Sequence, residues 1–458
     1  MLEEPVIRVL PLIAIPMMIS MLIDSFYNIA DAYFVSQLGS TATAAVGVND
    51  SLAQIIRSIS MGFGVGASSY ISRLMGARQD EEACRVGTTT LITAMLVLFV
   101  LAAPMQLLVD PLVVLLGSVE STNQYSVDYA RFILAAAPFT AGEVVLAQLL
   151  RAEGSTYYSM VGMVSGCVVN VVLDPIFITG LGLEVAGAAL ATGISKFVSF
   201  SVLLIPFLRG KTLIELKLCF FTPNRKIYSE VAKMGVPAFL RSSMLGVSTI
   251  VTNNIAGFFG DCALAAASVS QRCVRLVSAA ILGFGQGFQP LAGYCWGAKQ
   301  YKRVREAFWT CSGLGVLAVL VIGSIMFAFA PALVNLFAKG DLDVIGLGST
   351  MIRSQCITMP LHIWVVIVNG LFLALGRAKA ASFLGLSRQL ICYVPCLIVF
   401  ALLCGETGLA IAQAAADVLS VMVTTPLVAK LMREIKKAES ADSTASMHRI
   451  PNSIYKNL

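Results

Sequence analysis

Long apolar stretches separated by short polar links run through this chain of 458 residues. An apolar run of about 18 or more residues can cross a bilayer as a helix. The pattern predicts twelve spans, at residues 9–35, 44–72, 86–109, 126–150, 157–180, 185–208, 231–257, 264–294, 307–333, 346–375, 380–404 and 408–431. The first stretch is long and has no small-residue cleavage site behind a short apolar core, so we expect it to remain as the first helix.

A glycine-rich pattern occurs twice and indicates internal duplication. Gly62-Phe63-Gly64-x-Gly66 followed by Gly76-Ala77-Arg78-Gln79 reappears as Gly283-Phe284-Gly285-x-Gly287 followed by Gly297-Ala298-Lys299-Gln300. Both pieces are displaced by 221 positions (283 minus 62, and 297 minus 76). The same offset aligns Pro16 with Pro237 and Gly187 with Gly408. Six spans per half is an even number, so both halves enter the membrane from the same side, as parallel repeats do in transporters.

The predicted fold is an all-α integral membrane protein with twelve transmembrane helices, arranged as two parallel six-helix repeats that form N- and C-lobes around a central cavity. Residues 1–208 form the N-lobe, residues 209–230 a cytoplasmic connection and residues 231–437 the C-lobe. Residues 438–458 lack a hydrophobic period, and we expect a disordered cytoplasmic tail. The glycine-rich pieces lie inside apolar spans and follow no predicted strand, which favours close helix packing over nucleotide binding.

Composition and charge agree with a membrane location. Hydrophobic residues make up 57% of the chain and charged residues 13%, whereas soluble domains are roughly 25% charged. Lysine and arginine gather in the links on one side, whereas the links on the other side carry only Lys339. This asymmetry predicts that both termini are cytoplasmic. The net charge of +6 is dispersed over short loops, so we expect no nucleic-acid partner.

The eleven cysteines and two histidines give no sign of a cofactor or an active site. Most cysteines stand singly within apolar spans, none form a CxxC pair, and only His362 and His448 could join them as ligands. Neither a GxSxG nor an HExxH motif is present. We therefore expect no resident cofactor and no enzymatic activity.

Polar residues inside the first span are the first candidates for function. Asp24, Asn28 and Asp31 follow one another at i, i+4 and i+7, with Ser20 one turn earlier, and so share one helical face. A carboxylate in the hydrocarbon costs at least ~2.5 kcal/mol on insertion scales and normally faces a cavity or a partner. The alternative is that the two aspartates are interfacial. Pro16 removes a backbone hydrogen bond and is a candidate hinge.

The fifth and sixth spans add further oxygen ligands. Asn170 and Asp174 stand at i and i+4 in the fifth span, and Thr192 lies among small residues in the sixth. Two carboxylates in a partly dehydrated pocket cannot both ionise cheaply, so the pair is expected to take up a proton near neutral pH. Carboxylate, amide and hydroxyl oxygens together also suit Na⁺. The sequence leaves both ions open.

Other polar residues within spans are candidates either for the substrate cavity or for pairing between helices. They are Arg57, Glu143, Gln271, Arg272, Arg275 and Asn369, in addition to Asp24 and Asn28. Lys196 and Asp417 are also 221 positions apart (417 minus 196) and opposite in charge. Equivalent positions in a repeat need not touch, so the offset alone does not predict an ion pair.

Taken together, these motifs resemble the multidrug and toxic compound extrusion (MATE) family over roughly residues 5–435. The resemblance is carried by the Pro16…Asp31 pattern, the paired GFGxG…GAR/KQ segments, Asn170-x-x-x-Asp174, and Ala188-Ala189-Leu190-Ala191-Thr192. In the prokaryotic DinF-like branch of the family, the positions matching Asp31, Asn170, Asp174 and Thr192 line an N-lobe cavity implicated in cation coupling. The NorM-like branch uses acidic residues of the seventh and tenth spans, and this chain has none there.

The resemblance implies a monomeric antiporter of the bacterial plasma membrane that exports amphipathic organic cations in exchange for H⁺ or Na⁺. The alternative is a flippase of related fold for a lipid-linked oligosaccharide or peptidoglycan precursor, which a long basic cavity and extra C-terminal spans would favour. The predicted coupling residues lie where the repeats differ, since Asp31 aligns with Thr252 and Asp174 with Pro395. The sequence therefore assigns the ion to the N-lobe.

Overall fold

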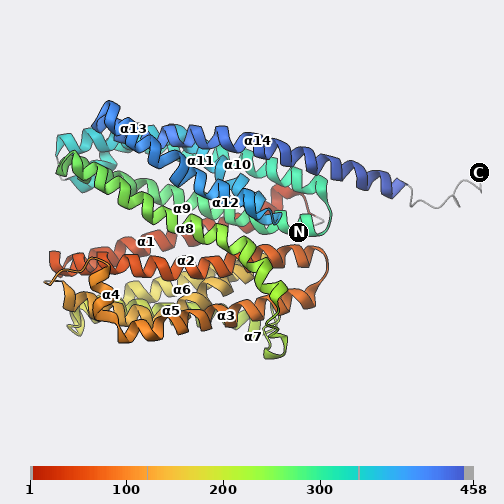
Figure 1. The fold of residues 1–458 in the computed structure, drawn as a ribbon, viewed down its shortest axis with the longest axis horizontal. Helices are drawn as coiled ribbons and strands as arrows, with labels where there is room; N and C mark the ends of the chain where they lie inside the picture. The colour runs from red at the N-terminus through yellow and green to blue at the C-terminus, as the bar shows by residue number, and fades with distance from the viewer. Residues whose placement is uncertain (1–3, 121, 339–340, 448–458) are drawn as a thin grey trace, which may run out of the picture.

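The computed structural model describes residues 4–120, 122–338 and 341–447, and all regular secondary structure within these ranges is helical. The helices run side by side along the long axis of the molecule and gather into two lobes (Figure 1). The N-lobe comprises α1 (Val6–Ser36), α2 (Ser40–Gly76), α3 (Asp80–Leu107), the short α4 (Val109–Leu115), α5 (Asn123–Ala152), α6 (Thr156–Pro175) with its π-helical continuation η1 (Ile176–Gly180), and α7 (Glu184–Leu208).

The C-lobe has a similar succession of helices. It comprises α8 (Arg225–Phe258), α9 (Asp261–Gly297), α10 (Tyr301–Ala338), α11 (Leu342–Ala374), the broken helix formed by α12 (Ala378–Leu386), the π-helix η3 (Ser387–Tyr393) and α13 (Val394–Cys404), and finally α14 (Glu406–Met447). A 3₁₀ turn, η2 (Leu218–Phe220), lies in the connection between the lobes. With each broken helix counted once and α4 set aside, the described residues give the twelve predicted segments.

Ten of these segments are long and apolar enough to cross a membrane by length and composition. The other two are α2 and α9, which are 37 residues each. Both lie between the lobes, where they pack against each other and against α8 and α1, respectively. A helix that faces protein rather than lipid needs small side chains for close approach more than it needs hydrophobicity. This explains why glycine and serine replace larger apolar residues in α2 and α9.

The internal repeat extends to the backbone conformation. Helices α2 and α9 begin 221 positions apart (261 minus 40). Each follows a glycine with positive φ, Gly39 at 106° and Gly260 at 109°. Arg78 and Lys299, which follow the ends of these helices, both have a φ of 58°. Residues other than glycine rarely adopt this left-handed conformation, so its occurrence at two equivalent positions is strong support for duplication.

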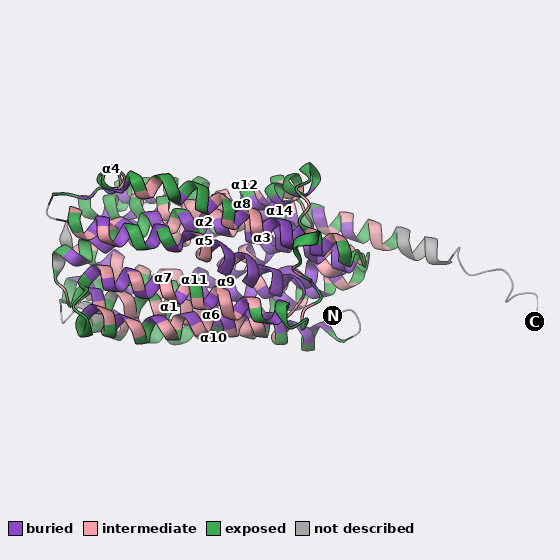
Figure 2. Ribbon diagram, turned by 90° about the horizontal axis from the view of Figure 1, so that it is seen from below, coloured by how far each residue is buried: buried purple, intermediate pink, exposed green. Residues whose placement is uncertain are grey.

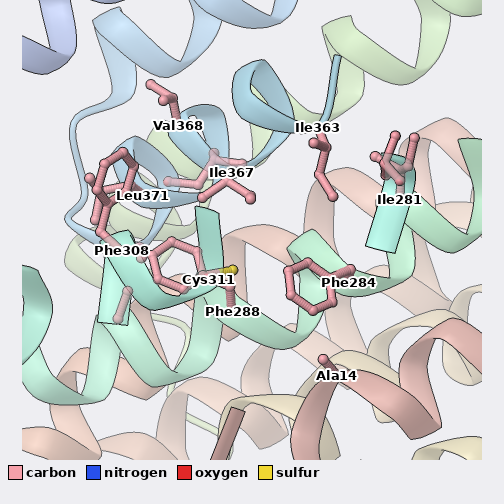
Figure 3. Close-up of a cluster of buried hydrophobic side chains, with 14 of the residues drawn as sticks. Ala14, Ile281, Phe284, Phe288, Phe308, Cys311, Ile363, Ile367, Val368 and Leu371 are labelled. Atoms are coloured by element: carbon pink, nitrogen blue, oxygen red, sulfur yellow. The ribbon is translucent and has the colours of Figure 1, made fainter. Parts of the chain in front are cut away.

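The first helix of each lobe crosses into the opposite lobe. The first half of α1 contributes Val6, Leu10 and Ala14 to the hydrophobic core of the C-lobe. Figure 3 shows Ala14 facing the C-lobe cluster around Phe284 and Phe288. Conversely, the start of α8 contributes Ile227 and Val231 to the core of the N-lobe. The lobes are thus joined by exchanged helix ends at the end of the molecule where the N-terminus lies.

We call this end the closed end, and the opposite one the open end. At the closed end, a Cβ on Gly235 of α8 would lie 2.5 Å from the carbonyl oxygen of Gly62, and one on Gly283 would lie 2.8 Å from the carbonyl oxygen of Met17. Toward the open end, Gly47 and Gly246 have no such neighbour within 4 Å. Buried segments correspondingly gather toward the end where N lies (Figure 2). The glycines of the repeated motif therefore allow helices of the two lobes to pack closely at the closed end. Their position inside apolar spans predicted such close packing.

Two helices extend beyond the boundaries that the sequence predicted. Residues 225–230 were expected in the connection but form the start of α8, where the side chain of Asn224 caps the helix by accepting a hydrogen bond from the Lys226 N–H at 2.9 Å. The tail was expected to begin at residue 438, yet α14 continues to Met447. An ion pair between Arg305 and Glu439 at 3.4 Å links this part of α14 to α10. Residues 448–458 of the predicted tail lie outside the described residues.

Candidate cation-coupling site

The predicted residues of the fifth and sixth spans lie together inside the N-lobe. Asn170 and Asp174 on α6 are each 0% exposed, and Thr192 on α7 is 8% exposed. With its amide nitrogen toward the carboxylate, Asn170 donates to Asp174 Oδ2 at 3.0 Å and accepts from the Thr192 N–H at 3.3 Å. In the reversed orientation the amide would instead donate to Thr192 Oγ1 at 3.4 Å. An ionised carboxylate can only accept, so the first orientation satisfies both groups.

Asp31 completes the group from α1, which packs against α6. It lies within electrostatic reach of Asp174. Tyr27, one turn earlier on the same face, lies close to Thr192 and within electrostatic reach of Asp31 and Asp174. Three helices thus bring the four predicted residues to one region of the N-lobe.

Each carboxylate in this region has one buried oxygen without a partner. Asp31 Oδ1 and Asp174 Oδ1 are buried and accept no hydrogen bond. Buried polar atoms are normally satisfied, so such an exception needs an explanation, for example a role in binding an ion. The oxygen donors of Asp31, Asp174, Asn170 and Thr192 fit a proton or Na⁺. Among the described residues, no group of three or more His, Cys, Asp or Glu side chains is arranged to hold a metal ion.

Local backbone chemistry explains why α6 changes its form at this point. Asp174 is followed by Pro175, which has no N–H to donate to the preceding turn. The π-helix η1 begins directly after this proline, and the Pro175 carbonyl oxygen accepts a hydrogen bond from the Thr179 hydroxyl at 2.6 Å. Single π-turns of this kind are frequent at functional sites.

Two ion pairs lie next to the four residues. Arg57 of α2 donates to Asp24 Oδ2 of α1 at 2.6 Å. Lys196 of α7 lies 3.1 Å from Glu143 Oε2 of α5, and its amine also lies 5.9 Å from the centre of the Tyr27 ring. The predicted cavity residues Asp24 and Glu143 are therefore paired between helices within the N-lobe.

The equivalent region of the C-lobe has neutral groups where the N-lobe has carboxylates. Thr252, which aligns with Asp31, shares a hydrogen bond of 2.8 Å with the Tyr393 hydroxyl.

Asp417, which aligns with Lys196, has its own partners in the C-lobe. It is 3% exposed and accepts from Arg388 at 2.9 Å, Gln413 at 3.3 Å and Thr358 at 3.4 Å. Lys196 and Asp417 thus pair within their own lobes and not with each other.

The remaining predicted residues are dispersed. Asn28 is exposed and its amide donates to the Asp24 carbonyl oxygen. Gln271 is half-buried and Arg272 exposed, both on α9. Asn369 is 5% exposed and donates to the Ala381 carbonyl oxygen at 3.0 Å, which places it in the packing between α11 and α12 and away from any open surface.

The predicted hinge lies within a continuous helix. Helix α1 runs unbroken through Pro16, whose carbonyl oxygen accepts a hydrogen bond from the Ser20 hydroxyl at 2.8 Å. A bend of α1 at Pro16 therefore stays a prediction for a conformation other than this one.

The sequence analysis did not single out Tyr27, Asp50, Arg241 or Arg388. Asp50 on α2 is within electrostatic reach of both Asp31 and Arg275. Asp50, Arg241 and Arg388 are charges inside predicted apolar spans, so the signal was present for them. Tyr27 gave no such signal, because an aromatic residue is unremarkable in a membrane helix.

Two similar lobes of six helical segments each, with ionisable side chains buried inside the bundle, are typical of a transporter built from parallel repeats. The MatE family model matches residues 16–176 and 237–399, one match in each lobe, starting 221 positions apart (237 minus 16). The chain belongs to the MatE family of transporters, as the sequence motifs indicated.

Relatives and solved structures agree with this assignment. The multidrug export protein MepA of Staphylococcus aureus strain MSSA476 is 28% identical over 410 residues, which cover 89% of this chain and 90% of MepA. A crystal structure of a MATE protein in complex with MaL6 superposes with a TM-score of 0.91 at 27% identity, covering 95% of this chain and 98% of the other. An outward-facing multidrug resistance MATE transporter of the MOP superfamily gives a TM-score of 0.90 at 27% identity, covering 95% and 97%.

Proposed function

We propose that this protein is a secondary active multidrug exporter that exchanges amphipathic organic compounds for H⁺ or Na⁺. Membership of the MatE family and the similarity to proteins described as multidrug exporters support this proposal. The same comparisons favour a transporter over an enzyme. We further propose that the protein acts as a monomer in the bacterial cytoplasmic membrane.

The positive-inside rule assigns the closed end to the cytoplasm, since the basic links lie there. On this assignment, the lobes touch on the cytoplasmic side and part toward the outside. From Met21 to Phe34, α1 has no buried residue among those whose side chains are described. The conformation is then outward-open, in agreement with the similarity to a solved outward-facing structure.

The observation that carries the coupling mechanism is the pair of buried, unpartnered oxygens on Asp31 and Asp174. In the outward-open state, a proton or Na⁺ from outside binds there and removes net negative charge from the N-lobe. A cationic cargo then loses electrostatic attraction and leaves, and the ion-loaded protein returns to the inward-open state. Coupling requires only that ion and cargo favour different states.

The test is transport by purified protein in liposomes. A pH gradient and a Na⁺ gradient are imposed separately, and the movement of a fluorescent organic cation is followed. We expect one of the two gradients to drive uphill transport. If neither gradient drives it, the antiport proposal is wrong for this class of substrate.

Variants of the site test its role in the same assay. Asp31→Asn and Asp174→Asn keep the shape of each side chain but remove the charge, and each should abolish gradient-driven transport. Asp110→Asn on α4 is the matched control, because Asp110 is exposed and outside the site. Full activity of both site variants would contradict the assignment.

A further inference from the structure

A crevice of about 410 Å³ opens on the surface of the N-lobe, near the open end of the molecule. Its walls come from the last turn of α3, the first turns of α5 and the start of α7. Figure 1 shows these three helices on the side of the N-lobe that faces away from the C-lobe. The crevice therefore faces lipid and not the space between the lobes. Its lining residues are Gln106, Asp128, Arg131, Phe132, Ala135 and Ala186.

The depth of the crevice in the membrane follows from the helix ends around it. Gln106 lies one residue before the end of α3, and Ala186 lies two residues after the start of α7. The Tyr125 hydroxyl donates to Glu184 Oε2 at 2.8 Å and ties α5 to α7 beside the crevice. Tyrosine is enriched where a membrane meets water. Because the basic links assign the closed end to the cytoplasm, the crevice lies at the level of the headgroups of the outer leaflet.

Two opposite charges line the crevice without pairing. Asp128 and Arg131 are three residues apart on α5, a spacing that normally lets helical side chains interact. Within the part of the chain that the structure describes, neither side chain forms an ion pair. Asp128 accepts from Gln124 at 3.2 Å, and the Arg131 carbonyl oxygen accepts from Gln106 at 2.7 Å. A charge inside a span normally has a partner or a function, so a ligand with both charges would satisfy the carboxylate and the guanidinium together.

The order of these groups along α5 matches the order of groups in a phospholipid of the outer leaflet. From the open end inward, Asp128 comes first, Arg131 second, and Phe132 and Ala135 last. A rise of 1.5 Å per residue separates Asp128 from Arg131 by about 4.5 Å along the helix axis. This distance is close to the separation between the ammonium and the phosphate of an ethanolamine headgroup. Phe132 and Ala135 then provide an apolar surface at the depth where the acyl chains begin.

We propose that this crevice binds a phospholipid of the outer leaflet that carries a primary ammonium group, phosphatidylethanolamine. The Arg131 guanidinium binds the phosphate through two parallel hydrogen bonds, Asp128 accepts hydrogen bonds from the ammonium, and an acyl chain lies along Phe132. The quaternary ammonium of phosphatidylcholine has no N–H to donate, and phosphatidylglycerol has no cation for Asp128. The site is separate from the predicted coupling residues, and the inference does not depend on the export function.

Native mass spectrometry of the purified full-length protein measures this selectivity. Phosphatidylethanolamine, phosphatidylcholine and phosphatidylglycerol with identical acyl chains are titrated one at a time, and the dissociation constants of the first bound lipid are compared. Glycerophosphoethanolamine, the headgroup without acyl chains, is added as a competitor. The variants are Arg131→Gln and Asp128→Asn. Arg353→Gln is the matched control, because Arg353 aligns with Phe132 (353 minus 221) but rests against the Phe327 ring of the C-lobe at 5.4 Å.

We expect the wild type and Arg353→Gln to bind phosphatidylethanolamine about tenfold more tightly than the other two lipids. Arg131→Gln and Asp128→Asn should both lose this preference. Asp128→Asn should also bind phosphatidylglycerol more tightly than the wild type does, because the repulsion of an anionic lipid is gone, and misfolding does not produce such a gain. Equal affinity of the wild type for the three lipids, or a preference kept by both variants, would overturn the proposal. Displacement of the lipid by an equal concentration of glycerophosphoethanolamine would show that the site takes a soluble zwitterion, and this too would overturn it.

Discussion

At the scale of single residues, each lobe has a largely buried ion pair, and one member of each pair occupies an equivalent position of the repeat with the opposite charge. In the N-lobe the α7 residue Lys196 is the cation and Glu143 its anion; in the C-lobe the α14 residue Asp417 is the anion and Arg388 its cation. Glu143 is 6% exposed and Asp417 is 3% exposed. The sequence showed that positions 196 and 417 are equivalent, but their partners come from other helices at unrelated positions in the repeat. Partners of this kind depend on the tertiary fold and could not be predicted from spacing.

Removing one member of the Lys196–Glu143 ion pair should lower the stability of the folded protein more than removing both. Lys196→Met leaves the buried Glu143 charge without its partner, and we expect a loss of about 3–5 kcal/mol of stability. The double variant Lys196→Met, Glu143→Leu should recover most of that loss, because no buried charge remains. Thermal unfolding of the detergent-solubilised variants measures both effects. A double variant as unstable as the single one would show that the pair is not the cause.

At the scale of elements, the Glu153 carboxylate is one of the groups that hold the connection between the lobes to the N-lobe. Glu153, directly after α5, accepts hydrogen bonds from the N–H groups of Leu213 at 2.9 Å and Ile214 at 3.2 Å. Burial raises the pKa of the Glu153 carboxyl above its usual 4.5, although hydrogen bonds from Ser155 and the two backbone N–H groups act in the opposite direction. The raised pKa means that the folded state disfavours the charged form.

The sign of the resulting pH effect follows from that shift. A raised folded-state pKa adds stability below the unfolded value of 4.5, and this stability is lost as the pH rises through the folded-state pKa. In thermal melts from pH 4 upward, the wild type should therefore lose stability relative to Glu153→Gln. Glu153→Ala, which removes the acceptor, should cost about 1–3 kcal/mol. Identical pH profiles for the wild type and Glu153→Gln would contradict this account.

The close contact between Gly235 and Gly62 at the closed end leads to a further prediction about α8. A side chain at Gly235 would collide with the Gly62 carbonyl oxygen, since even its Cβ would lie 2.5 Å away. Gly235→Val should therefore destabilise the sealed arrangement and shift the protein toward a state in which the closed end is parted. Gly246→Val on the same helix is the control, because nothing lies within 4 Å there.

Gln79 and Gln300 lie in equivalent turns of the two lobes at the closed end. The distance between spin labels at these two positions measures how far the lobes are apart there. Their separation should lengthen in Gly235→Val and stay unchanged in Gly246→Val. A distance distribution identical to that of the wild type in Gly235→Val would show that these glycines do not control closure.

At the scale of the whole molecule, the sequence predicted the architecture well but did not predict which lobe each end of α1 and α8 packs against. Apolar runs and the 221-residue offset predicted twelve segments and two parallel repeats, since span length and duplication are local properties of the sequence. The exchange of the ends of α1 and α8 between the lobes was not predicted, because both lobes offer them an apolar surface. The structure brings Asn170, Asp174 and Thr192 together, while their function in ion coupling stays a proposal.

The central claim is that ion and cargo are linked through Asp31 and Asp174, and ligand-induced ion release measures this linkage most directly. Cargo is added to purified protein in weak buffer, and released protons, or displaced radioactive Na⁺, are counted per cargo molecule bound. The account predicts release of H⁺ or Na⁺ by the wild type and none by the double variant Asp31→Asn, Asp174→Asn. Because the variant is permanently neutral at this site, it should bind a cationic cargo more weakly, so release is counted at a cargo concentration that saturates it. Equal release by the double variant, or no release of either ion by a wild type that binds cargo, would contradict it.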